Sequence, residues 1–433
     1  MIIVCEAQCK GISHEKVNSG FIFGLRLAYP KEKIIFFSEK LHYIELINIF
    51  KSNNISIGNI ENIPISFDAS KSFSVGGLFK YYFLFKKIFD KLLSFKVNKI
   101  FFLSTNPVIL FTIKKIKQQK KYKHICCTFV LHGELEDISN IDYKEPYSPV
   151  FEKKLMTLSY REMIFKALKN IDKIPGLIIS RLTSPIDYLY SRYTLIFKRI
   201  FRVKRMMMWL HSSYYKYISL SPHVTKNARK FIDTRYLNFQ TIVMPIIYTK
   251  PSQVRFNKFI KFAVFGYGDS VQMNKMLFLL SRKMLSRSYE IRIISMDSRG
   301  TEGFKNISHV GHGGILTREE MEESVKDIDV FINLYNENRH KFGCSLSIFE
   351  SLSYLKPVLH LSNPGYDYFN KISLPIGYKT NSLNEFVDKM SDMIENYSEY
   401  KGKLKFFRKN MLKCRQKYSI ENNLGKLMKS FTF

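Results

Sequence analysis

The sequence predicts an α/β protein built from two doubly wound, Rossmann-like domains that face each other across a cleft. Short apolar segments alternate with helical segments in both halves of the chain, which is typical of parallel sheets covered by helices. A polar segment at residues 249–258 separates the two halves. The length of 433 residues exceeds one ordinary domain and suits two large ones.

The first half of the chain supplies the first domain, which we expect at residues 1–250. Nearly continuous apolar runs, such as "IIVCEA" and "HICCTFVLH", predict strands that are buried on both faces. Helical periodicity at residues 41–50 and 77–95 predicts connecting helices, and residues 139–216 read as a basic helical insertion. The predicted strands are residues 2–7, 33–39, 99–105, 124–132, 215–221 and 241–248.

The second half repeats the alternation and supplies the second domain, which we expect at residues 251–433. A helix is predicted in "SLSIFESLSYL" at residues 345–355, and Pro357 ends it. The chain is basic and helical from about residue 401, and the last helix is expected to pack back on the first domain. The predicted strands are residues 259–268, 289–297, 329–335 and 356–362.

The chain is strongly basic. Its 68 Lys and Arg residues against 37 Asp and Glu residues leave a net charge of +31. This excess favours a nucleic acid, an anionic membrane surface or a phosphate-bearing substrate as partner. Codon bias is an alternative source of the lysines, but it explains the scarcity of acids less well. No apolar run is long enough to cross a membrane, the first residues do not resemble a secretory signal, and the six cysteines follow no zinc-binding spacing, so we expect a cytosolic protein.

One candidate ligand site follows the first strand of the second half, in "VFGYGDSVQMNK". Ligands of doubly wound sheets bind at the carboxyl ends of the strands. Gly266 and Gly268 allow the backbone to approach a ligand closely, and the next helix offers unpaired N–H groups to a phosphate. The alternative is a tight turn without a ligand, since the loop matches neither the GxGxxG nor the Walker A pattern.

A second candidate site lies in "NENRHKFGCSLSIFESLSYLKPVL", after the strand that ends at residue 335. Gly343, Ser345 and Ser347 would present amides and hydroxyls at the helix start, with Arg339 and Lys341 beside them. Together they make a phosphate cradle with counter-charges.

Glu350 lies one to two turns further along the same helix. Its neighbours in "IFESLSYL" are mostly apolar, so the carboxylate is expected on the buried side. There it could accept hydrogen bonds from the hydroxyls of a sugar. The alternative is a surface glutamate next to a solvated loop.

The order of these segments resembles the C-terminal domain of retaining, GT-B-fold glycosyltransferases, most closely glycosyltransferase family 4. The similar segments are "FGYG", "HVGHGGILTREEMEESVKDIDVFINLY" and "FGCSLSIFESLSYLKPVLHLSNPGYDYF", within residues 262–369. The resemblance implies a nucleotide-sugar donor, Glu350 on its ribose, retention by front-face displacement and no bound metal or other cofactor. No Asp-x-Asp metal motif argues otherwise.

The sequence departs from the family at two places. The family has an acid eight positions before the ribose-binding glutamate, where this chain has Phe342, so that acid is absent or displaced to Glu337. The family grips the diphosphate with an Arg just after the first glycine, where Tyr267 stands here. Its Lys corresponds to Lys275 only if the loop is lengthened. Arg339 and Lys341 would then replace the lost charge.

The first domain contributes a third candidate site in "FVLHGELED". His132 resembles the histidine with which such enzymes contact the donor sugar from across the cleft, and a packed or solvated histidine is the alternative. The loop "CEAQCKGISHEKVNSG" would border the acceptor, and its Lys10, His14 and Lys16 could meet a phosphate there. An ordinary surface loop is equally compatible.

Residues 186–210 read as a basic amphipathic helix that binds an anionic membrane surface without spanning it, although a core-facing helix fits the same pattern. Taken together, the sequence predicts a cytoplasmic glycosyltransferase, peripheral at the inner face of the membrane. Its acceptor would be a lipid-linked glycan or another growing oligosaccharide of lipopolysaccharide, capsule or similar polysaccharide synthesis. The alternatives are a basic nucleic-acid-binding protein, for which no recognised motif is present, and a non-catalytic scaffold.

Overall fold

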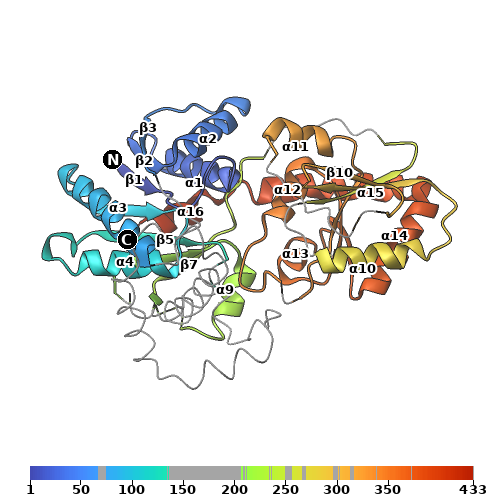
Figure 1. Ribbon diagram of the computed structural model, residues 1–433. Coiled ribbons are helices and arrows are strands. Elements are labelled where there is room, and N and C mark those ends of the chain that lie inside the picture. The colour runs from blue at the N-terminus through green and yellow to red at the C-terminus, as the bar shows by residue number, and fades with distance from the viewer. Residues whose placement is uncertain are drawn as a thin grey trace, which may run out of the picture.

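The chain folds into two α/β units, each built on one parallel sheet, in a computed structural model (Figure 1). The first sheet has the order β3-β2-β1-β4-β5-β6-β7, and the second has the order β10-β9-β8-β11-β12-β13. We call the units around them the first and the second domain. The structure describes residues 1–66, 75–133, 135, 206–207, 210, 212–233, 235, 237–248, 256–265, 270–295, 301, 303–312, 316–337, 339–371 and 373–432.

Thirteen strands are parallel to their neighbours in these two sheets. Those of the first sheet are β1 (Ile2–Cys5), β2 (Ile34–Ser38), β3 (Ile60–Pro64), β4 (Lys99–Phe102), β5 (Cys126–Leu131), β6 (Tyr215–Ser219) and β7 (Phe239–Thr241). Those of the second are β8 (Ile260–Phe265), β9 (Tyr289–Ile294), β10 (Ile307–Val310), β11 (Val330–Asn333), β12 (Val358–Leu361) and β13 (Gly377–Thr380).

Helices cover both sheets. The first domain has α1 (Glu15–Ala28), α2 (Lys40–Ser52), α3 (Val75–Ser94), α4 (Pro107–Lys117) and α9 (Pro222–Ala228). From the second half of the chain come α10 (Ser270–Ser281), α11 (Arg318–Val325), α12 (Leu346–Tyr354), α13 (Pro364–Phe369), α14 (Leu383–Glu395), α15 (Tyr397–Lys417) and α16 (Leu424–Phe431).

The apolar runs of the sequence become the central strands. Every residue of β1 and β11 is buried, as expected for strands covered on both faces. The prediction of two doubly wound α/β domains is therefore confirmed. The edge strands β3, β10 and β13 were not predicted, because they are partly exposed and their sequences, "IENIP", "ISHV" and "GYKT", mix polar with apolar residues.

The predicted strand at residues 241–248 is wrong beyond its first residue. Only Thr241 belongs to β7, and residues 242–248 form no regular element. The segment is apolar because Ile242, Met244 and Ile246 are buried in the core, not because it pairs with a strand.

The last helix of the chain lies on the first domain, where the red α16 runs among the blue elements (Figure 1). Leu427 of α16 is buried and reaches the helix α1 at Gly24, and the ring of Phe431 meets that of Phe101 at 5.4 Å. One hydrophobic cluster also contains buried residues of both domains, among them Ile246 and Ile348. The two domains therefore share a packed boundary.

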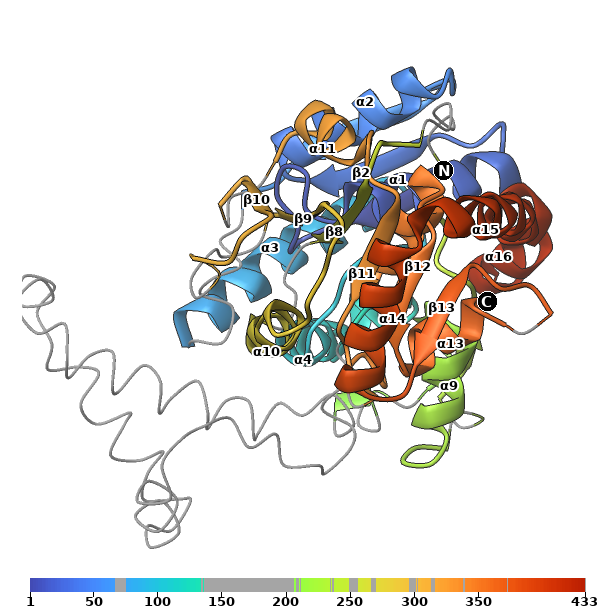
Figure 2. The same ribbon diagram turned by 90° about the vertical axis from the view of Figure 1, so that its right-hand side faces the viewer.

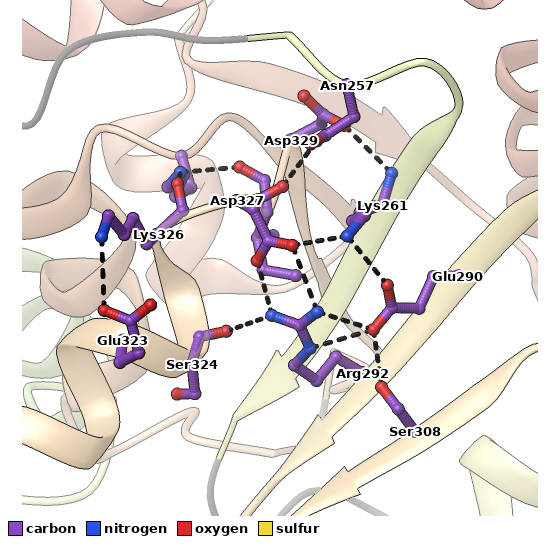
Figure 3. Close-up of polar contacts among 12 residues, drawn as sticks. Asn257, Lys261, Glu290, Arg292, Ser308, Glu323, Ser324, Lys326, Asp327 and Asp329 are labelled. Carbon is purple, nitrogen blue, oxygen red and sulfur yellow. Dashed lines mark hydrogen bonds and ion pairs between the residues drawn. The ribbon is translucent and has the colours of Figure 1, made fainter.

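A network of ion pairs joins the amino-terminal ends of β8, β9 and β11 (Figure 3). Lys261 and Arg292 both pair with Asp327 and with Glu290. The fully buried Asp329 accepts hydrogen bonds of 3.0 Å from the Lys261 amide and from the Asn257 side chain. This network lies at the edge of the sheet opposite to the ligand-binding edge, so we assign it to stability.

Candidate active site

The topology places one ligand-binding crevice on each sheet. In the first sheet the strand order reverses between β1 and β4, and in the second it reverses between β8 and β11. Ligands of doubly wound proteins bind at the carboxyl ends of the strands at such a point. Loops from both of these places meet at the domain boundary.

The helix α12 starts at the switch point of the second sheet. Ser345 is its N-cap residue, and the Ser345 Oγ accepts a hydrogen bond of 3.3 Å from the amide of Ser347. The Ser347 Oγ in turn lies 2.8 Å from the hydroxyl of Tyr366. The first amides of a helix lack partners within the helix, so this end of α12 can bind an anion. The structure thus brings both predicted serines to one helix N-terminus.

Loop 336–345 connects β11 to α12 and carries the predicted cations. The Arg339 guanidinium lies 5.8 Å from the ring centre of Tyr335, and the side chain of Lys341 is half-buried. Gly343 is buried. Arg339, Lys341, Gly343, Ser345 and Ser347 therefore lie on one continuous segment, as expected from the sequence.

Glu350 reaches across the domain boundary. Its Oε2 forms an ion pair with the Nζ of Lys16 from the first domain, and the two side chains are only 15% and 5% exposed. The same Nζ lies 3.3 Å from the hydroxyl of Tyr354. Among the described residues, Oε1 of Glu350 has no hydrogen-bond partner. The expectation of a carboxylate on the buried side of the helix is met, with a lysine from the other domain beside it.

The carboxylates and the ammonium group at this boundary influence one another. Burial lowers the pKa of Lys16, but Glu350, Tyr354 and Glu15 together outweigh burial and raise it, so Lys16 is a cation. Burial, and then the negative charge of Glu350, raise the pKa of Glu15 from 4.5 to about 7. Glu15 therefore titrates near neutral pH beside the candidate site.

His132 follows β5 in the first domain and lies next to loop 336–345. Its backbone carbonyl accepts a hydrogen bond of 3.3 Å from the amide of Cys344, immediately before the α12 N-cap. Its Nε2 donates to the Leu103 carbonyl at 2.7 Å, and burial lowers its pKa to about 4. The imidazole is therefore neutral near pH 7. The structure brings His132 and the start of α12 together across the boundary.

The first domain adds one buried acid, Glu6, that the sequence did not single out. Glu6 follows β1 and is fully buried, and its carboxylate accepts hydrogen bonds from the amides of Gln8 and Cys9 and from the Ser104 hydroxyl. The ring of His14 lies 4.7 Å from that of His132. The sequence pattern that could have pointed to Glu6 is a single acid directly after a buried strand.

Four other residues named from the sequence are exposed or packed in the first domain. Lys275 is exposed on α10 and makes no hydrogen bond or ion pair with a described residue, and Lys10 is exposed. Glu337, the alternative first acid, is also exposed. Phe342 is 1% exposed and belongs to a hydrophobic cluster of the first domain, where its ring meets that of Phe231 at 5.5 Å.

Further predicted features lie outside the described residues. These are Gly266, Tyr267, Gly268 and nearly all of residues 186–210. Within the described residues, no group of three His, Cys, Asp or Glu side chains is arranged to hold a metal ion.

A groove with a volume of about 270 Å³ opens along the boundary beside Tyr354. Residues of α2 and α11 line it, and Figure 2 shows these two helices next to each other. Charged side chains of both signs line it, including Arg318, Glu322 and Lys356.

No protein-family model matches the chain, and no curated protein sequence matches it. Its fold is similar to that of several solved glycosyltransferases, each at a TM-score of 0.53 and 10% sequence identity. The match with the glycosyltransferase of Rickettsia africae spans 99% of this chain and 97% of that one. For the lipopolysaccharide outer core galactosyltransferase WaaB, these shares are 99% and 98%. For Anabaena HepE, solved in complex with UDP and glucose, both are 99%. The chain therefore has the two-domain, GT-B-like fold of these glycosyltransferases.

Proposed function

We propose that the protein is a glycosyltransferase that takes a sugar from a nucleotide-sugar donor. Its acceptor is a lipid-linked or growing surface glycan, as in lipopolysaccharide or capsule synthesis. The resemblance to glycosyltransferase family 4 adds retention of the anomeric configuration and no requirement for a metal. The similar solved structures support the proposal through their fold, and WaaB and HepE do so through the kinds of reactions and ligands that their names state.

The observation that carries the proposal is the composition of α12. Its N-terminus, with Ser345 and Ser347, presents amides and hydroxyls to an anion, and Arg339 and Lys341 precede it on the same loop. Glu350, on the same helix, has one carboxylate oxygen, Oε1, that accepts no hydrogen bond from a described residue. A diphosphate at the helix start and a ribose at Glu350 would fit one nucleotide along one helix.

The same arrangement suits the chemistry. Negative charge builds up on the diphosphate as the bond to the sugar breaks, and the α12 amides, Arg339 and Lys341 would stabilise it. In front-face displacement the acceptor hydroxyl attacks from the side on which the diphosphate leaves, and its proton passes to a phosphate oxygen. A neutral His132 would hydrogen-bond a hydroxyl of the donor sugar without adding charge.

We also propose that the protein works in the cytoplasm, at the inner face of the membrane. The charge of +31 supports this, as do Phe406 and Leu412, which are exposed on α15 among lysines. Within the described residues, no helix is long and apolar enough to span a bilayer. Vesicles of rising anionic lipid content should sediment more protein at low salt. Binding that ignores lipid charge would contradict this placement.

Binding of nucleotides tests the function directly. The protein should bind UDP- or GDP-sugars and not oligonucleotides, as measured by thermal shift and calorimetry. Glu350→Gln should weaken binding of the nucleotide sugar about 10-fold to 100-fold, because it removes a charged hydrogen-bond acceptor. Glu323→Gln, on the exposed face of α11, is the matched control and should bind as the wild type does. Binding of oligonucleotides alone would support a nucleic-acid-binding protein instead.

A further inference from the structure

The segment that holds the predicted phosphate site is anchored on the first domain. Loop 336–345 leaves β11 of the second domain and returns to α12 of the same domain. Between these ends, Phe342 leaves its own domain and packs against Phe231 in the hydrophobic cluster of the first domain. Its ring is 1% exposed, so it fills a site inside that cluster.

Polar contacts from α9 of the first domain hold the backbone around Phe342. The Nε2 of His223 donates to the carbonyls of His340, at 3.3 Å, and Gly343, at 3.2 Å. The Nδ2 of Asn227 donates to the carbonyl of Lys341 at 2.8 Å. The helix lies beside α13 of the second domain in both ribbon views (Figures 1 and 2). Three backbone carbonyls of the loop are thus held by two side chains of the other domain.

His223 is itself held in the tautomer that this contact requires. Carbonyl oxygens only accept, so Nε2 carries the hydrogen, and Nδ1 then accepts a hydrogen bond from the Oγ of Ser221 at 2.7 Å. Burial lowers the pKa of His223, so a neutral ring makes these contacts. His223 is also 8% exposed, and a hydrogen bond inside a protein is costly to leave unmade.

Among the described residues, hydrogen bonds from a side chain of the second domain reach the other half of the loop. The Nδ2 of Asn363 donates to the carbonyls of Asn336 and Arg339, at 2.8 and 2.7 Å. The part of the loop nearest to Ser345 therefore depends on the first domain for its position. This part includes Lys341 and the amides that lead into α12.

We propose that α9 of the first domain positions the donor-binding loop, with His223 and Asn227 as positioning residues and Phe342 as the apolar anchor. The nucleotide site is then complete only when the two domains are in contact. Nucleotide affinity depends on residues that do not touch the nucleotide. The proposal rests on the proposed function for the identity of the ligand, but not for the contacts that hold the loop.

Hydrogen exchange of the full-length protein tests the contacts without any ligand. In the double variant His223→Ala/Asn227→Ala, amides of the 339–345 peptide should exchange about 10-fold faster than in the wild type. His223→Gln, which keeps a donor near the position of Nε2, should restore part of the protection. Lys226→Ala is the control, since Lys226 is exposed on the same helix. Phe342→Ala should also accelerate exchange, and Phe342→Leu should do so less.

Binding of UDP and GDP, measured by calorimetry on the same proteins, tests the consequence. The double variant should bind the nucleotide about 10-fold more weakly, with Lys226→Ala unchanged. Unchanged exchange in the double variant overturns the proposal, and so does faster exchange with unchanged affinity. If the wild-type protein binds neither UDP nor GDP, the proposed function and the role of the loop in donor binding are overturned. Hydrogen exchange still decides in that case whether α9 holds loop 336–345. A variant that does not fold is replaced by the Asn227→Ala single variant, judged by the same two measurements.

Discussion

Replacing Lys16 by Met tests whether a buried ion pair joins the two domains. Lys16 Nζ pairs with Glu350, and the two side chains are 5% and 15% exposed. Met has nearly the length of Lys and can keep the apolar contact with the ring of Tyr354, over which Nζ lies at 4.8 Å. The substitution therefore removes the charge with little change in packing.

The expected cost follows from the burial of Glu350. Removing one partner of a buried pair costs about 3–5 kcal/mol, because the other charge is left without compensation. Water reaches part of the Glu350 side chain, so we expect a cost at or just below the lower end of this range, about 2–3 kcal/mol. In the double variant Lys16→Met/Glu350→Gln no charge is stranded, and the cost should fall below about 1 kcal/mol.

Urea denaturation followed by circular dichroism, at low and high salt, gives the free energies of unfolding. Glu350→Gln strands the buried Lys16 charge in the same way and should cost about as much as Lys16→Met. The two single variants and the double variant form a cycle, and its coupling energy should be at least about 3 kcal/mol. Salt should change this value little, because a buried pair is screened less than an exposed one. A coupling energy below about 0.5 kcal/mol would show that the pair is not formed in solution and would refute the reasoning.

Three further predictions concern stability. Folding raises the pKa of Glu15 from 4.5 to about 7, so between these pH values the folded protein binds more protons than the unfolded chain. The free energy of unfolding should therefore fall as pH rises from 4.5 to 7. Glu15→Gln should make the melting temperature less dependent on pH between pH 5 and 8. Gly20→Ala should destabilise the protein by more than about 1 kcal/mol, because the added Cβ would lie 2.0 Å from the Pro245 carbonyl oxygen. Gly402→Ala is the contrasting variant: its Cβ would point into open space on α15, so it should stabilise the protein by up to about 1 kcal/mol. Burial alone would raise the pKa of Asp327, but Arg292 and Lys261 lower it from 3.8 to about 2. The melting temperature of Asp327→Asn should therefore lie well below that of the wild type above pH 4, and the difference should disappear as pH falls toward 2. A difference that does not change with pH would contradict this.

The sequence predicted the fold because the central strands are buried on both faces. Segments such as β1 and β11 are nearly continuous apolar runs, which few other structures produce. Edge strands lack this signature, and β3, β10 and β13 were missed for that reason. Residues 242–248 show the converse error, since an apolar segment that packs without pairing has the same composition as a strand.

The candidate site was predictable only where it lies on one continuous segment. Ser345, Ser347 and Glu350 follow from one helix and its start, and their positions agree with the sequence pattern. The pairing of Glu350 with Lys16 joins residues 334 positions apart and depends on how the domains meet. Phe342 could be recognised in the sequence as a missing acid, but its packing in the other domain could not.

The structure of the protein with bound UDP or GDP tests the central claim most directly. We predict the diphosphate at the start of α12, within hydrogen-bond distance of the Ser345 or Ser347 amide or hydroxyl. The ribose should donate a hydrogen bond to Oε1 of Glu350. A nucleotide bound in the first domain, or in the second domain away from α12, would contradict the proposed donor site and the function inferred from it.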